Sequence, residues 1–488
     1  MYKTLLILKY LRKRRIAWVS LLAVTLCTTM VIVVMSVMGG WLGMFRESQR
    51  GLIGDVIVTR RSWSGFPHYE KVVEALEKMP QVKAAVPAIQ SFGLINITNQ
   101  IRSGVQVYGY PIEKIGQVNR FPQSLYRQWQ SEVNAAADKD KAAVGAAAEK
   151  AVSFKPPLPA EDYQMLVPNS KTDVSKWPGM IVGDGVVGIR KAADGTITPP
   201  SSLLEHWAKL TVMGMDDDSG APDVNAKSER SFWIVDNSRT KFYQQDENTV
   251  YVPFDVLQKD LRMDADSYTD AVTGLQVAIP ARTSNIQIAL KPGVDSAAAV
   301  IAIEATVKNV LSANGYDADL HGIDVLTWEQ LQADFINAIE HEIVLTTLLF
   351  AIISIVAVFL IFCIFYMIVV EKTRDVGIIK SVGATSGGVM SIFLGYGLAI
   401  GMLGGGLGLL LSYLIVHYIN EIHSWMGRAL HIEVWNAKTY MFDTIPNQLD
   451  PKKVSIIVAA AVVSSVLGSL YPAIRAARMN PVEALRWE

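Results

Sequence analysis

The chain has 488 residues, of which 50% are hydrophobic and 19% are charged, and its formal net charge is −1. This length exceeds one ordinary core and predicts two or more folded units. The even balance of charge argues against a nucleic-acid partner, because phosphate recognition needs a large basic excess.

The chain opens with a basic segment, residues 1–15, followed by an uncharged run, residues 16–45. The run is much longer than the apolar core of a signal peptide, and no clear small-x-small cleavage site lies near its end. We therefore expect a retained first transmembrane helix. The positive-inside rule places the basic segment in the cytoplasm. Its basic residues are Lys3, Lys9, Arg12, Lys13, Arg14 and Arg15.

Residues 46–340 have the mixed pattern of a large α/β domain. Helices predicted at 69–78 and 296–313 are flanked by β-branched runs, which favours β-α-β units. The Ala-rich stretch 134–160 is either a polar helix or a flexible insertion, and with residues 216–230 it could separate two lobes. The predicted strands are residues 55–59, 94–98, 104–108, 249–252, 274–279 and 285–290.

Three more apolar runs follow, and each reaches the roughly 20 residues that cross a bilayer. Neither Pro nor Gly interrupts residues 327–370, which predicts a stiff helix entering the second span, with a break possible at His341-Glu342. The fold class is thus a membrane domain of four transmembrane helices, with a large mixed α/β domain inserted between the first two. The later segments are a span at 343–370, a cytoplasmic segment at 371–384, a span at 386–418, a short outer loop at 419–453, a span at 454–474 and a cytoplasmic tail at 475–488.

The third span is rich in glycine. Gly397, Gly401 and Gly405 are spaced four apart and align on one helix face. In lipid, small residues at this spacing let another helix approach closely. This face has two interpretations: it packs within the set of four helices, or it forms an interface with a second chain.

The segment between the second and third spans, residues 371–384, is compact and charged. Glu371 and Arg374 are three apart, and Gly377 and Gly383 are expected to allow bends at either end of a short helix. The residues alone permit two interpretations: a handle that receives force from a soluble partner, or a solvated loop that anchors the spans.

Catalytic and metal motifs are missing from the sequence. It contains no Gly-x-x-x-x-Gly-Lys-Ser/Thr loop and no His-Glu-x-x-His, so we expect a non-catalytic chain that binds neither ATP nor metal. Both cysteines, Cys27 and Cys363, fall inside spans, which excludes a disulfide framework in the α/β domain. The near absence of ionisable residues from the spans argues against a secondary transporter.

Two motifs resemble those of FtsX-like permeases, the membrane subunits of type VII ABC transporters. Residues 371–384 look like the coupling helix of that family, and residues 471–486 are similar to its Pro-Ala-x-x-Ala-Ala-x-x-x-Pro-x-x-Ala-Leu signature. The order of span, large domain and three spans is also similar. Among MacB-like and Lol-like members the chain most resembles the LolC/LolE branch, through Trp328-Glu329, Phe335 and Glu340 before the second span.

This resemblance implies an inner-membrane permease, in bacteria, that works with a second permease chain, alike or different. A separate ATPase would bind ATP and Mg, dock on the cytoplasmic segment and drive changes in a periplasmic α/β domain. The cargo would be a lipoprotein or another amphiphile; the alternative is FtsX-like activation of cell-wall hydrolases. Met38, Trp41 and Leu42 are expected either to contact cargo or to pack against lipid and helices. The coupling residues would be Glu371, Lys372, Arg374, Asp375, Gly377, Ile378, Ile379, Lys380 and Gly383.

Overall fold

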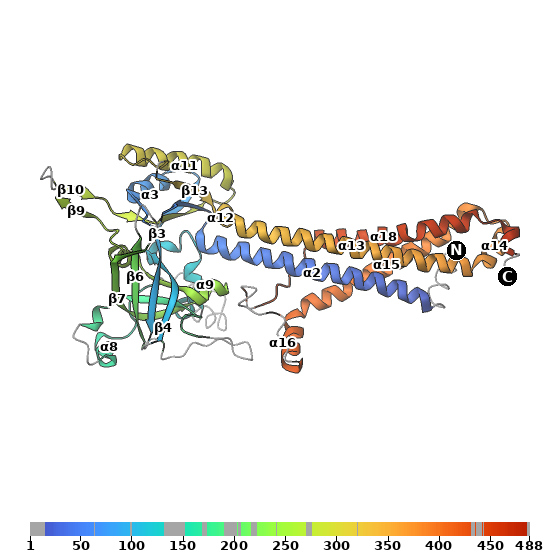
Figure 1. Cartoon of the computed structure of the whole chain (residues 1–488), viewed down its shortest axis with the longest axis horizontal. Coiled ribbons are helices and arrows are strands. Elements are labelled where there is room, and N and C mark those ends of the chain that lie inside the picture. Colours follow the sequence, from blue (N-terminus) through green and yellow to red (C-terminus); the bar gives the residue numbers. More distant parts are fainter. Residues whose placement is uncertain are drawn as a thin grey trace, which may run out of the picture. The chain divides into compact units, whose positions relative to one another are not determined.

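The structure, a computed structural model, divides into two compact units (Figure 1). The helical unit comprises Met1–Met44, Asp334–Trp435 and Thr444–Glu488, and the α/β unit comprises Phe45–Ala333 and Asn436–Asp443. The basic residues 1–14, most of 134–160, the start of 216–230 and Arg486 lie outside the described residues. The structure describes residues 15–62, 64–97, 100–130, 152–167, 173–189, 203, 206–215, 222–240, 242–269, 276–319, 321–430, 435, 442 and 444–485.

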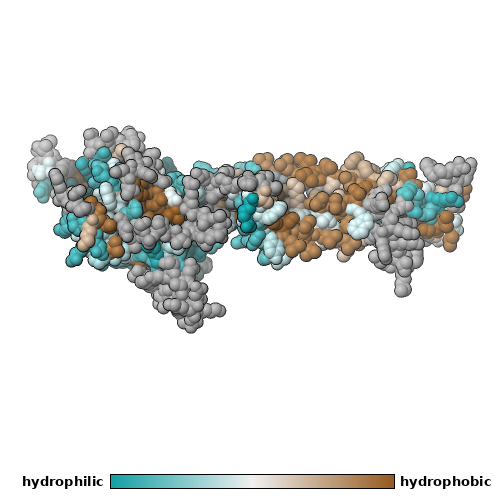
Figure 2. Space-filling model, turned by 90° about the horizontal axis from the view of Figure 1, so that it is seen from below, coloured by the Kyte–Doolittle hydropathy of each residue, from teal (hydrophilic) through white to brown (hydrophobic). Residues whose placement is uncertain are grey.

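Long helices make up most of the helical unit. A buried cluster that includes Val24, Phe365, Val376, Ile400 and Ala473 joins five of them. Their outward side chains are apolar as well as exposed, as on a protein surrounded by lipid, and Figure 2 shows this apolar surface in brown. The helices are α2 (Arg15–Ile53, up to Met44), α13 (Ala333–Glu371), α14 (Thr373–Ser381), α15 (Ser386–His417), α16 (Ile419–Leu430), α18 (Pro451–Arg478) and α19 (Pro481–Leu485).

Five described helices, not four, are long and apolar enough to cross a membrane. The additional one is α11 (Ser296–Ala313) in the α/β unit. It buries residues at four-residue spacing (Ala299, Ile303, Val307, Leu311) in a core with the sheet. Its outer side carries Lys308, whose Nζ lies 2.8 Å from Glu304 Oε1. Packing on a sheet thus accounts for the apolar content of α11.

The helix that enters the second span begins later than expected. Thr327 forms a capping box with Gln330 and starts the short helix α12 (Trp328–Leu331). Gln332, at φ −103° and ψ 16°, ends α12. Helix α13 then runs without interruption from Ala333 to Glu371, so the break is at Gln332 and not at His341-Glu342.

One nine-stranded sheet organises the α/β unit, in the order β13-β1-β12-β3-β4-β8-β5-β7-β6. The first lobe contains β1 (Val56–Arg60), β3 (Val82–Ile97), β12 (Asn285–Leu290) and β13 (Ile323–Thr327). Helix α3 (Tyr69–Glu77) connects β1 to β3, but β12 lies between these strands, antiparallel to both. The expected β-α-β units are therefore present in split form, with α3 and α11 in one core.

The second lobe is inserted between β3 and β12. Its strands β4 (Gln100–Tyr110) and β8 (Thr249–Pro253) are parallel, as are β5 (Gly179–Gly183) and β7 (Pro222–Ser238). Two further clusters of buried side chains pack on these strands. One is rich in aromatic rings and also contains Ala84 of β3 and Ala289 of β12, so it continues into the first lobe. The other elements are β2 (Phe66–Pro67), α4 (Ile112–Ile115), α5 (Phe121–Ser124), a π-helix (Tyr126–Gln130), α8 (Ala160–Leu166), a 3-10 turn (Val174–Lys176), β6 (Trp207–Met215), α9 (Tyr243–Asn248), α10 (Phe254–Asp260), β9 (Asp266–Thr269), β10 (Gln276–Ile279) and β11 (Arg282–Thr283).

The chain enters and leaves the α/β unit at adjacent strands. Val56 of β1 is the antiparallel partner of Thr327 of β13. Asp55 fixes this junction: its Oδ1 lies 2.8 Å from Arg50 Nε in the last turns of α2, and its Oδ2 accepts a 2.8 Å bond from Leu290 N. The Asp55 carbonyl also accepts a 3.2 Å bond from Trp328 N at the start of α12. The ends of α2 and α12 are thus tied to one point.

Candidate functional site: the helix between the second and third spans

Residues 371–384 form a short helix with defined ends. Helix α13 ends at Glu371, Lys372 precedes α14, and Val382 follows it. Gly383, at φ +108°, closes α14 in a Schellman motif: its N–H bonds Lys380 O (3.0 Å), and Ala384 N bonds Ile379 O (3.1 Å). Gly383 therefore makes the expected bend.

Gly377 does not make the other bend. It lies in the middle of α14 and is buried. The turn between α13 and α14 falls at Lys372 instead, where Thr373 Oγ1 donates a 2.8 Å bond to Val370 O. A glycine on a buried helix face permits close packing, so Gly377 contributes by its small size and not by backbone freedom.

The inner face of α14 is held to the end of the bundle. Thr373, Val376 and Gly377 are buried there. Lys380 Nζ donates to Ala477 O (2.9 Å) and Met479 O (2.7 Å) at the C-terminus of α18. Carbonyls at a helix end have no partner within the helix, so an ammonium group there satisfies them and favours the helix dipole.

Replacing Lys380 with methionine is expected to loosen α14, because the two carbonyls lose their donor while the aliphatic stem is kept. A hydrogen bond to a charged group contributes about 1.5–3 kcal/mol. We expect faster hydrogen–deuterium exchange in 371–384 and 475–485 but unchanged exchange in the α/β unit. Lys380→Arg is the control, since it keeps the donors. Unchanged exchange in the methionine variant would contradict this role.

The outer face of α14 is open. Arg374, Ile378 and Val382 lie at positions i, i+4 and i+8 and form one stripe, here called the outer stripe. Ile378 is 47% exposed and Val382 84% exposed, although both are large and apolar. Glu371 is also exposed, Ile379 is half-buried, and Lys372 Nζ pairs with Asp375 Oδ2. An apolar strip bordered by charges on a rigidly seated helix suits docking of a protein.

The small residues of the C-terminal signature bring α18 and α19 against this helix. Ala473, Ala476 and Ala477 are buried on α18, and Ala484 is buried on α19, which packs on α14. Asn480 Oδ1 accepts a 3.1 Å bond from Val482 N at the start of α19. The sequence motif identifies this segment, and the structure shows that the segment packs against α14.

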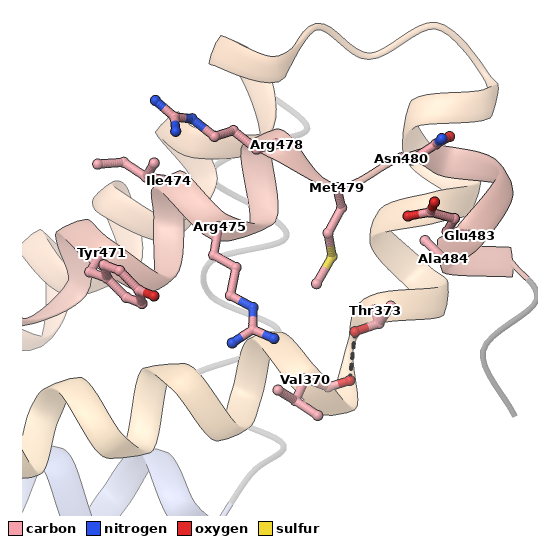
Figure 3. A pocket seen from close by; sticks show the side chains of 10 residues that line it. All are labelled: Val370, Thr373, Tyr471, Ile474, Arg475, Arg478, Met479, Asn480, Glu483 and Ala484. Atoms are coloured by element: carbon pink, nitrogen blue, oxygen red, sulfur yellow. Dashed lines mark hydrogen bonds between the residues drawn. The ribbon is translucent and has the colours of Figure 1, made fainter.

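A cavity of about 520 Å³ lies beside α14, between α18, α19 and the end of α13. In Figure 3 the side chains of Arg475 and Met479 point toward Val370 and Thr373. The Arg475 guanidinium lies over the Tyr366 ring, 4.6 Å from its centroid. The inner face of α14 thus has room beside it, within an end of the bundle that is otherwise tightly bonded.

The glycines of α15 pack against two helices of the same chain. A Cβ at Gly397 would lie 2.7 Å from Ser469 Cβ, and one at Gly401 would lie 3.0 Å from Val462 Cα, both on α18. Gly405 is in ordinary contact with Val458, also on α18. On another side of α15, a Cβ at Gly404 would lie 2.8 Å from Val24 Cβ of α2. The small residues that these glycines meet on α18, Ser465 and Ser469, are likewise four apart in the sequence.

Met38, Trp41 and Leu42 lie on one side of α2 and are all partly exposed. The Trp41 ring packs against Phe335 of α13, with 6.1 Å between the centroids. The structure therefore gives Trp41 a packing partner and leaves part of each of the three side chains accessible.

Two family models and several known proteins match this chain. Residues 347–481 match the family model described as FtsX-like permease C-terminal, and residues 17–167 match the MacB-like periplasmic core domain. The chain is 23% identical to the lipoprotein-releasing system transmembrane protein LolC of Neisseria meningitidis, with 99% of this chain and 98% of that protein covered. It is 32% identical to LolE of Haemophilus influenzae over 24% of this chain and 29% of that one.

Among solved structures, the chain is similar to the periplasmic region of MacB from Actinobacillus actinomycetemcomitans. The two sequences are 10% identical, the match covers 59% of this chain and 94% of that chain, and the TM-score is 0.27. The family matches, the relatives and the apolar helices support a multi-pass membrane protein similar to ABC transporter permeases. Within that class the resemblance predicted from the motifs is confirmed: the chain is FtsX-like, carries a MacB-like core domain and is similar to the LolC/LolE branch.

Proposed function

We propose that this chain is the permease subunit that receives force from a separate ABC ATPase at α14 and passes it to the α/β unit. The outer stripe of α14 carries this proposal: it is exposed, partly apolar and fixed in place by Lys380. A slack loop would absorb a push, whereas a helix bonded to α18 transmits it. ATP and Mg would be bound by the ATPase.

The connections of α14 support a mechanical route. Helix α13 precedes it and has 39 residues, or about 58 Å at 1.5 Å per residue, well beyond the roughly 30 Å of a hydrocarbon core. Helix α12 leads back to β13, next to the strand that follows α2. Because Asp55 ties both connections together, we propose that movements of α2 and α13 reach the α/β unit as one displacement.

The proposed topology has α2, α13, α15 and α18 crossing the bacterial inner membrane. Helix α14 and both termini would be cytoplasmic and the α/β unit periplasmic. Two permease chains, alike or related, would form each complex. The basic residues near the N-terminus favour this orientation under the positive-inside rule.

The proposed cargo is a lipoprotein or another amphiphile taken from the outer side of the membrane. Support comes from relatives named for lipoprotein release and from the lack of polar pathway residues in the apolar spans. The partly exposed Met38, Trp41 and Leu42 would contact the acyl part of the cargo.

A release assay tests this function. The chain, its ATPase and a second permease chain would be reconstituted in vesicles that carry an acylated lipoprotein, and ATP-dependent release would be measured. We expect Trp41→Ala to lower release per ATP several-fold, because it removes apolar contact area. Trp18→Ala is the control, since Trp18 lies nearer the other end of α2 and is also exposed. ATP-independent release, or equal release by both variants, would refute the cargo site. If a cell-wall hydrolase co-purifies and no lipoprotein is released, the FtsX-like signalling function takes its place.

A further inference from the structure

Helix α16, directly after α15, is strongly two-sided. Its apolar residues follow helical spacing, so they share one arc of the surface. The opposite arc is polar. The apolar arc contains Tyr418 (just before α16), Ile422, Trp425, Met426 and Ala429, and the polar arc contains Asn420, Glu421, His423, Ser424 and Arg428.

The polar arc holds α16 to its own chain. The Asn420 amide donates to Ile445 O (3.1 Å) and accepts from Ile445 N (2.9 Å). His423 Nε2 accepts a 3.2 Å bond from Trp435 N. These bonds fix the rotation of the helix and leave Ile422 and Trp425 (59%) exposed on the other side.

The direct connection between α15 and α16 determines where the apolar arc lies relative to the membrane. Tyr418 is the C-cap of α15, so α16 begins where a membrane helix ends. Helix α14 precedes α15, and α16 is therefore at the opposite membrane surface. In Figure 1, α16 turns aside and runs across the direction of α15. Trp and Tyr side chains are enriched at this level of a bilayer, between headgroups and acyl chains.

We propose that α16 lies in the membrane surface opposite α14, with its apolar arc buried among lipid acyl chains and its polar arc toward the headgroups. An amphipathic helix of this kind sinks about 5–10 Å into the boundary region. Arg428, exposed on the polar arc, suits the phosphate groups there.

This contact would fix the depth of the bundle at one surface. The loop bonded to α16 also reaches α2: Pro446 packs against Gly40, and Ser36 Oγ donates to Gln448 O. Lipid, α16, this loop and the outer part of α2 thus form a continuous set of contacts. The proposal requires only that α15 spans the membrane, so it stands or falls separately from the cargo and the ATPase.

Spin labelling in lipid nanodiscs tests the proposal. Single cysteines would be placed in the full chain carrying Cys27→Ala and Cys363→Ala. Ile422→Cys and Trp425→Cys report on the apolar arc, and Ser424→Cys and Arg428→Cys are matched positions on the polar arc. We expect labels at 422 and 425 to show a several-fold higher ratio of oxygen to nickel-chelate collisions than labels at 424 and 428.

Two outcomes would overturn it. Equal nickel accessibility at all four positions would place α16 in water, and labels at 422 and 425 shielded from both reagents would show that a protein surface, such as a second permease chain, covers the arc. A second measurement avoids cysteine variants: brominated phospholipid should quench wild-type fluorescence more than that of Trp425→Phe. Equal quenching would contradict the lipid contact.

Discussion

Replacing Gly397 with leucine is expected to prevent the helical unit from assembling stably. The first side-chain atom alone would lie 2.7 Å from Ser469 Cβ and 3.2 Å from Ser465 O. The Gly397 carbonyl also accepts a 2.8 Å bond from Ser465 Oγ, so separating the helices would break that bond too. Overpacking costs about 1–3 kcal/mol in a core that can adjust, and backbone on the opposing helix adjusts poorly. We expect a large loss of monodisperse protein in detergent and a lower melting temperature.

Gly406→Leu is the matched control for this experiment. Gly406 lies on the same helix, but a Cβ there would meet nothing within 4 Å. Both variants replace a helical glycine and so gain the same intrinsic helix propensity. Similar melting temperatures for the two variants would show that the α15–α18 contact does not limit stability.

Replacing Ile378 with aspartate is expected to disrupt binding of the ATPase without unfolding the permease. Ile378 is at the centre of the outer stripe, where a carboxylate would be desolvated by a docked partner. A central contact of this kind contributes about 2 kcal/mol or more, which corresponds to about 30-fold weaker affinity. The measurement is the dissociation constant of the ATPase for the permease in nanodiscs.

The control is Ile301→Asp. Ile301 is 71% exposed on α11 of the α/β unit, so the same change is made at another accessible position. We expect ATPase affinity to remain at the wild-type value in this variant, and thermal stability to be similar in both. If Ile378→Asp binds the ATPase as tightly as the wild type, the docking role of α14 is wrong.

The sequence predicts the long elements well because each carries a strong local signal. A membrane helix is apolar on every side, and α11 shows its helical spacing within its own 18 residues, with the capping residue Asp295 directly before them. The split sheet was not predictable in this way. The position of β12 between β1 and β3 depends on residues far apart in the chain, and nothing in the helix-flanked runs distinguishes adjacent from separated strands. Helix α16 lies within the predicted outer loop 419–453, although its apolar residues repeat at helical spacing.

For the candidate site, the sequence identified the two segments but not their connection. Lys380 joins them through the carbonyls of Ala477 and Met479, and main-chain acceptors leave no trace in a side-chain pattern. Gly377 and Gly383 look alike in sequence, yet one is buried within a helix and the other has positive φ. The partners of the α15 glycines likewise follow only from tertiary packing.

The insertion of the second lobe has a consequence for biosynthesis. Val56 emerges from the ribosome early, but its sheet partners Ile288 and Thr327 are synthesised only after the whole inserted lobe. Pairings between such distant residues form slowly. Until translation has nearly reached the second membrane span, strand β1 has neither of its partner strands. Its backbone is then exposed to proteases and to aggregation. The first lobe should therefore be the last part of the α/β unit to mature.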